Sequence, residues 1–264
     1  MRNIWMFPRN KRRMVPLDTA LILRAMVVAS ELGTSWVGDQ GQQNKFSELL
    51  EKYGLKGGGN QRDDNPGGSR TYEAQMRLLG LLYKDTDTNT LKLTQAGEDL
   101  VNLQEPTKTM EFQILKCQFP SSYSLARNVG IDRSIKIRPF VFLLKLAADQ
   151  DLNGLTDKDI MVPVVYGRQE TDFQKCKNLI LQLRSADFPA VIPDTSEIRT
   201  TKTQSASYDS RIRDIKDIAN TFKNVLQGCG LVDLRYVGEE TRIFPRKGIM
   251  DMVSEVEAMP YIDF

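Results

Sequence analysis

The 264-residue chain contains no histidine. Histidine is the commonest general base near neutral pH and a frequent metal ligand, so its absence removes the usual routes to acid–base and metal chemistry. A Ser-His-Asp triad and a Cys-His pair are excluded outright. Any catalysis by this chain would have to use carboxylates, lysine or tyrosine.

Cysteine is also scarce. The three cysteines, Cys117, Cys176 and Cys229, are far apart and odd in number, and no CxxC pair occurs. This pattern predicts neither a zinc site nor a disulfide framework. It is typical of a reducing compartment, so we expect a cytoplasmic protein.

Long apolar runs are missing as well. No stretch approaches the roughly 18 apolar residues that a membrane-spanning helix requires. The beginning of the chain, MRNIWMFPRNKRR, has no apolar centre and ends in basic residues, which is unlike a signal peptide. We therefore expect no membrane partner.

The charges nearly cancel, since 36 Lys and Arg face 34 Asp and Glu for a net charge of +2. Their distribution is more informative, because a basic arm at residues 1–15 precedes the first acid, Asp18. Such an arm can follow a phosphate backbone or enter a minor groove, and a solvated terminus is the alternative. Trp5 and Phe7 are expected to anchor it. The candidate DNA contacts in the arm are Arg2, Arg9, Asn10, Lys11, Arg12 and Arg13.

Residues 68–103 carry the clearest structural pattern. Ser69 is expected to cap a helix that begins at Arg70, in which apolar residues recur three or four apart. Two short strands around a polar turn follow, and then a last helix. After two earlier helices, this order predicts a winged-helix subdomain at residues 16–105, with the helix at Arg70 in the major groove of DNA.

Candidate DNA contacts in this subdomain lie on the polar side of that helix and in the glycine-rich loop 56–68 before it. Arginine can bond guanine through two hydrogen bonds, and glutamine can do the same for adenine. An ordinary exposed helix face and a disordered surface loop are the alternatives. The candidates are Asn60, Gln61, Arg62, Ser69, Arg70, Thr71, Tyr72, Gln75 and Arg77.

A second helix–hairpin–helix pattern follows a predicted linker at residues 106–134. Thr156 and Asp159 are spaced as a capping box, and Ser207 is expected to cap a long helix. We assign a second winged-helix subdomain to residues 135–258 and a tail to residues 259–264, so the fold class is mainly α with short β-hairpins. The candidate contacts here are Arg199, Lys202, Tyr208, Ser210, Arg211 and Arg213.

One formal match to a catalytic motif occurs. Pro193-Asp194 and Asp214-Ile215-Lys216 have the outline of the PD…(D/E)xK site, in which two carboxylates hold Mg²⁺. That site belongs on adjacent strands, whereas Asp214 and Lys216 fall two apart in a predicted helix and point away from each other. A charged helix face is the alternative, and a metal-dependent nuclease using these three residues stays open.

The motifs occur in an order that resembles a known family. In sequence they are WxFPRN, SRTYEAQMRLLGLLYKD, LTQAGEDL, ILKCQFPSSY, KIRPFVFLLKLA, LTDKDI and RIRDIKDIANTF. Over nearly the whole chain, this series resembles the recognition half of AlwI-like type IIS restriction endonucleases and their nicking relatives. The resemblance implies two winged-helix subdomains that grip a short asymmetric duplex site.

In that family a separate C-terminal domain cuts outside the site with a Mg²⁺-dependent PD…ExK centre. This chain stops about where that domain would begin, so we expect no catalytic residue, metal ligand or cofactor in it, and Mg²⁺ only in the complete enzyme. The resemblance places family contacts at the basic arm and at the helix starts near Arg70 and Tyr208.

We therefore expect sequence-specific duplex DNA binding as the target-recognition domain of a type IIS restriction endonuclease, with cleavage by a separate domain or subunit. The alternative is a winged-helix transcription regulator. Such a regulator would usually be a symmetric dimer that reads a palindrome.

Overall fold

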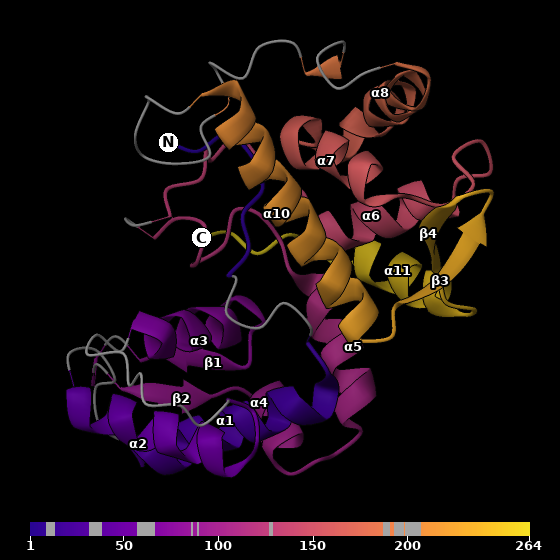
Figure 1. Ribbon diagram of the computed structural model, residues 1–264. Coiled ribbons are helices and arrows are strands. Elements are labelled where there is room, and N and C mark those ends of the chain that lie inside the picture. The colour runs from indigo at the N-terminus through magenta and orange to yellow at the C-terminus, as the bar shows by residue number, and fades with distance from the viewer. Residues whose placement is uncertain are drawn as a thin grey trace. The chain divides into compact units, whose positions relative to one another are not determined.

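The computed structural model describes residues 1–8, 14–31, 39–56, 67–85, 87–88, 90–126, 129–186, 191–192, 198 and 207–264. The chain divides into two compact units, coloured along the sequence in Figure 1. One consists of Pro8–Ile114, and the other of Met1–Phe7 with Leu115–Phe264. The predicted fold class is confirmed, because the described secondary structure is mainly helical with two short antiparallel hairpins.

The smaller unit has three helices, a hairpin and a fourth helix. In order these are α1 (Pro16–Ser30), α2 (Gln40–Lys52), α3 (Gly67–Leu78), β1 (Leu82–Lys84), β2 (Leu91–Leu93) and α4 (Gln95–Val101). Thr94 caps α4, as its position before the helix predicts, by accepting the Gly97 N–H at 3.1 Å. The core forms where the apolar sides of the four helices meet, at Leu23, Phe46, Met76 and Leu100.

Helix α3 begins earlier than its sequence suggests. It starts at Gly67, so Ser69 lies inside the first turn and is not the N-cap. The predicted start at Arg70 is therefore wrong. A serine cap is a preference of only about 1 kcal/mol, which neighbouring residues can override.

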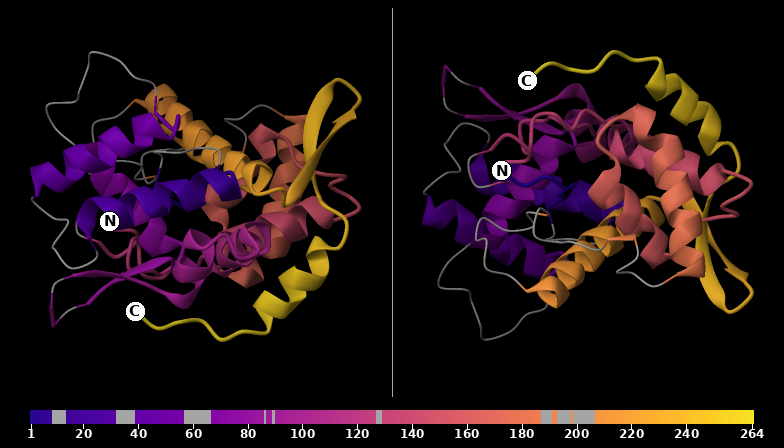
Figure 2. Two further views of the ribbon diagram at one scale, coloured as in Figure 1. Left: turned by 90° about the horizontal axis from the view of Figure 1, so that it is seen from below. Right: turned by 90° about the horizontal axis from the view of Figure 1, so that it is seen from above.

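The larger unit contains most of the remaining elements. They are α6 (Pro139–Ala148), α7 (Asp157–Tyr166), the 3₁₀-helix η1 (Glu170–Asp172), α8 (Phe173–Ser185), α10 (Tyr208–Gly228), β3 (Val232–Val237), β4 (Glu240–Pro245) and α11 (Ile249–Glu257). Helix α5 (Pro106–Lys116) crosses the boundary between the units, and the stretch from residue 115 to 134 belongs to the larger one. In both views of Figure 2 the β3–β4 hairpin extends past the helices of this unit.

The first seven residues are packed into the larger unit. The side chains of Trp5 and Phe7 are buried, and both rings contact Phe222 edge-on, at centroid distances of 5.4 and 5.8 Å. Trp5 also donates its indole N–H to the carbonyl of Gly167. The prediction that these two aromatic residues anchor the beginning of the chain is confirmed.

A single bridge adds a third segment to the second hairpin. Leu155, just before α7, exchanges both backbone hydrogen bonds with Ile243 of β4, at 3.1 and 2.8 Å. Helix α10 packs along α7 and leads directly into β3. The order is therefore α6, a bridging residue, α7, then α8 and α10, the hairpin and α11. None of the helices described combines the length and apolar character that a membrane crossing requires.

Candidate nucleic-acid interface

The start of α3 is the first place where DNA contacts were predicted. The side chains of Ser69 and Arg70 lie outside the described part of the structure, as do Asn60, Gln61 and Arg62 in the preceding loop. Their assignment stays a prediction. The structure does describe the side chains from Thr71 onward, so the rest of the helix can be assessed.

Gln75 does not lie on an exposed face. Its side chain is 0% exposed, and its amide nitrogen lies 3.3 Å from the sulfur of Met14. The prediction that Gln75 is available to read a base is therefore wrong in this conformation. The reason is the helical repeat, since Gln75 is three residues before Leu78 and four before Leu79, and both of these are buried.

The other α3 candidates are partly exposed. Thr71 and Tyr72 are half-buried, and the Tyr72 ring packs edge-on against Phe46 at a centroid distance of 5.6 Å. Burial raises the pKa of Tyr72, so its hydroxyl stays protonated at neutral pH. Arg77 lies 3.5 Å from the carboxylate of Glu73, and its side chain is 34% exposed. Arg77 is thus held on the helix surface with its guanidinium reachable.

The predicted basic arm divides into a packed part and an undescribed part. Arg2 donates from its guanidinium to the Val129 carbonyl at 3.0 Å, and its backbone pairs with the segment around Ile131. It is thus half-buried in the larger unit and does not extend from it as a free arm residue. Arg9, Asn10, Lys11, Arg12 and Arg13 lie outside the described residues.

The beginning of α10 is capped as predicted. Ser207 accepts the N–H of Ser210 at 3.3 Å and precedes the first helical residue, Tyr208. The Tyr208 hydroxyl donates to the carbonyl of Ile192 at 3.1 Å, so this proton is already bound within the protein. Burial raises the pKa of Tyr208, and the nearby Asp209 acts in the same direction.

Arg211 and Arg213 have opposite environments. Arg211 is only 8% exposed and shares the inner side of α10 with Ile215, whereas Arg213 is exposed. The prediction that Arg211 contacts bases from an open helix face is therefore wrong in this conformation. Two residues along a helix turn the side chain by about 200°, which explains the difference. Ser210 is half-buried beside them.

The outer side of α10 adds two residues, Lys216 and Asn220, to the predicted contact Arg213. Arg213 and Lys216 are exposed and Asn220 is half-buried, at spacings of three and four that place them on one stripe. Arginine, lysine and asparagine are side chains that bond base edges or phosphates. The buried periodicity of Ile215, Ala219 and Phe222 was the signal that could have identified this stripe.

A buried ion pair fixes the start of α7 against α8. Asp159 is 1% exposed and receives two hydrogen bonds from Arg184, at 3.2 and 2.7 Å. Asp159 also completes the predicted capping box, because it accepts the Thr156 N–H at 2.7 Å while Thr156 accepts the Asp159 N–H. The positive charge of Arg184 is thus paired with Asp159 within the protein.

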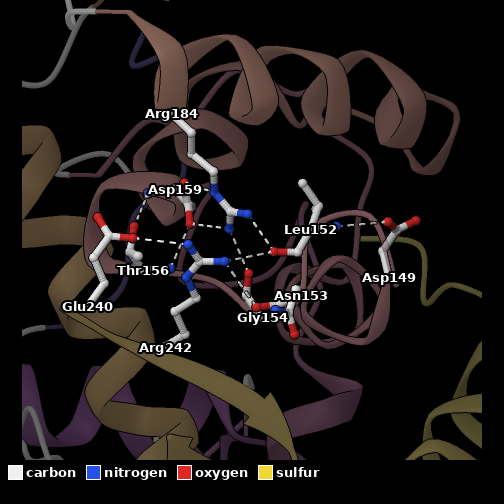
Figure 3. Close-up of polar contacts among 9 residues, drawn as sticks. All are labelled: Asp149, Leu152, Asn153, Gly154, Thr156, Asp159, Arg184, Glu240 and Arg242. Carbon is white, nitrogen blue, oxygen red and sulfur yellow. Dashed lines mark hydrogen bonds and ion pairs between the residues drawn. The ribbon is translucent and has the colours of Figure 1, made fainter. Parts of the chain in front are cut away.

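The hairpin joins the same network, shown in Figure 3. Arg184 and Arg242, from α8 and β4, both donate to the carbonyl of Leu152, and Arg242 also donates to Asn153 at 3.2 Å. Glu240 accepts from Arg242 at 3.1 Å. The two guanidinium groups converge on the turn before α7, which attaches β4 to that turn.

The possible nuclease site gains no support from the described residues. Asp214 and Lys216 lie on α10, and Asp194 lies outside the described part. Within the described ranges, no group of three or more Cys, Asp and Glu side chains is placed to hold a metal ion. The cysteine thiols are buried, and burial raises the pKa of Cys117 and Cys176 to about 12.

Comparison with known proteins gives a likeness in structure but none in sequence. No protein family model matches the chain, and no curated protein matches it by sequence. The fold is similar to the BpuJ1 endonuclease binding domain, solved in a crystal with pyrene- and phenanthrene-modified DNA. The TM-score is 0.57 at 15% sequence identity, and the match covers 97% of this chain and 84% of that chain. The likeness establishes a shared fold with a binding domain of an endonuclease.

Proposed function

We propose that this protein binds duplex DNA at a specific sequence, as the target-recognition module of a restriction endonuclease. The observation that carries the proposal is the fold match over 97% of the chain to an endonuclease binding domain crystallised with DNA. The motif order, which resembles that of AlwI-like type IIS enzymes, supports the narrower assignment to type IIS.

In this proposal each unit is a winged helix. The smaller unit has the order of three helices, hairpin and helix, and the larger unit adds the Leu155 bridge to the outer side of β4. A strand between the first two helices that pairs with the hairpin is typical of the winged-helix arrangement. The helices directly before the hairpins, α3 and α10, are then the recognition helices.

The outer stripe of α10 is the best-supported contact. Arg213 and Lys216 are exposed, and none of the described ion pairs neutralises them. Because the net charge is only +2, affinity has to come from local clusters of this kind, and it should fall steeply with salt. We expect the arm residues 9–13, the predicted loop 56–68 and a second predicted loop at residues 195–206, which contains Arg199 and Lys202, to add phosphate contacts.

Cleavage is assigned to a separate domain or subunit that uses Mg²⁺. The support for this division is the resemblance to AlwI-like enzymes, in which a separate domain cuts the DNA. This chain would then recognise the target sequence and position the partner on the DNA, and the partner would hydrolyse the phosphodiester bond.

Selection of bound duplexes from a random pool tests the proposal. We expect enrichment of one asymmetric site of about five base pairs, since two different units read one duplex. An enriched palindrome would favour a winged-helix transcription regulator. A pool without any enriched sequence would contradict sequence-specific binding.

A further inference from the structure

The outer edge of strand β3 has no partner strand among the described residues. Strand β4 pairs with β3 on one side, and on its other side Ile243 pairs with Leu155, so the sheet ends at β3. A free edge presents a row of backbone N–H and C=O groups that can pair with another strand.

The hydrogen-bond register shows which backbone groups point outward. The Arg246 N–H donates to the Leu231 carbonyl at 3.0 Å, and these residues continue the β3–β4 register as a directly bonded pair. Bonded and non-bonded pairs alternate along an antiparallel ladder. The N–H and C=O groups of Val232, Leu234 and Tyr236 therefore point away from β4.

The side chains along this edge are exposed and do not protect it. Tyr236 is 83% exposed and Leu234 is 45% exposed, which is unusual for large apolar residues. Natural edge strands are normally blocked by proline, lysine or a bulge. Strand β3 has six residues, VDLRYV, without proline, lysine or a bulge; its two charged side chains, Asp233 and Arg235, are of opposite sign, so they do not repel a second copy of the strand.

We propose that two copies of this protein join through antiparallel pairing of their β3 strands, centred on Leu234. In this register Asp233 lies opposite Arg235 of the partner subunit, and the same pair forms again across the two-fold axis. Leu234 meets Leu234 of the partner subunit. Every outward N–H and C=O group of the three even-numbered residues becomes hydrogen-bonded.

The register is specified by charge and by backbone direction. A centre shifted to Arg235 would place two arginines opposite each other, which is destabilising. It would also present backbone groups of residues that already bond to β4. Asp233 and Arg235 lie 3.7 Å apart within one strand and are about half-exposed, and the Arg235 guanidinium also lies over the Phe244 ring at 4.8 Å from its centroid. Pairing with a second copy would exchange this weak, exposed ion pair within one strand for two pairs across the two-fold axis.

The charge around the hairpin turn argues against DNA as the occupant of this edge. Asp233, Glu239 and Glu240 face only Arg235 and Arg242 in the hairpin, so phosphates would meet a net negative segment. The order Asp-Leu-Arg is self-complementary, because antiparallel pairing of the strand with itself places each Asp opposite an Arg. A strand from a different protein does not need this property. A second copy of the same strand matches it at each position.

Sedimentation velocity from about 10 to about 500 µM tests the proposal, because a contact of one strand pair is small and weak. We expect the wild-type protein to form dimers at the upper concentrations. Arg235→Asp and Asp233→Arg each place like charges opposite one another and should weaken association at least about tenfold. An equimolar mixture of these two variants should associate again, because each then supplies the charge that the other needs.

Leu234→Pro is a second variant with a different mechanism. It removes one outward N–H and leaves the ladder to β4 intact, so the monomer should keep its fold by circular dichroism and lose self-association. A wild-type protein that stays monomeric at the highest concentration would overturn the proposal. Unchanged association in the single variants, or none in their mixture, would overturn it as well.

Discussion

Leu155 and Ile243 exchange both of their backbone hydrogen bonds, at 3.1 and 2.8 Å, and so attach the turn before α7 to the hairpin. Amide hydrogen exchange followed by NMR should show slow exchange at both residues, because each N–H is bonded and buried. The Leu234 amide points outward and should exchange fast in dilute protein. Equal protection of Leu234 under those conditions would place a strand of the same chain on that edge and contradict the assigned register.

The buried pair of Asp159 and Arg184 should matter for stability. Asp159→Asn removes the buried negative charge that pairs with the partly exposed Arg184 and should lower the free energy of unfolding by about 3 kcal/mol. Urea denaturation measures this at a constant m value. The matched control is Glu257→Gln, which breaks the one-third-exposed pair with Lys145 and should cost less than about 1 kcal/mol. Equal losses in the two variants would refute the role of Asp159.

The cysteines should be inert in the folded protein. Cys117, Cys176 and Cys229 are buried, and burial raises the pKa of the first two thiols to about 12. At pH 8 only about one thiol in ten thousand is then a thiolate, which is the reactive form. A thiol reagent should label none of the three in the native state and all three in denaturant. Rapid labelling of Cys117 or Cys176 in native protein would contradict their placement.

Asp85 should titrate at unusually low pH. Its hydrogen bond with Lys92 lowers the pKa of Asp85 to about 2, from an ordinary 3.8, and the N–H groups of Thr88 and Asp87 act in the same direction. The contribution to stability is present above pH 3.8 and is lost as the pH falls through about 2. Carboxyl NMR measures the midpoint, and Lys92→Met should move it upward. A midpoint near 3.8 in the wild-type protein would be incompatible with this turn geometry.

The features that sequence predicted correctly are local ones. Ser207, Thr94 and the Thr156–Asp159 box cap their helices because a cap depends only on residues within three positions. The hairpins after α3 and α10 follow from apolar alternation around polar turns. Trp5 and Phe7 were recognisable as anchors because large aromatic residues in a short basic segment have few other roles.

The features that sequence missed depend on distant contacts. Gln75 is buried against Met14, which is 61 residues away, and its polarity gave no indication of that position. Tyr208 bonds the carbonyl of Ile192, which is 16 residues earlier in the chain. Arg211 has the same chemistry as Arg213, and it is distinguished by its place four residues before Ile215 on the side of α10 that is buried.

Fluorescence anisotropy with the duplex enriched from the random pool tests the central claim most directly. Arg213→Ala should weaken specific binding by about 1–3 kcal/mol, or roughly 5- to 150-fold, because Arg213 lies on the outer stripe of α10. Arg133→Ala removes an exposed arginine outside that helix and should change the affinity by less than about twofold. Wild-type affinity in Arg213→Ala, or an equal loss in both variants, would contradict recognition by α10.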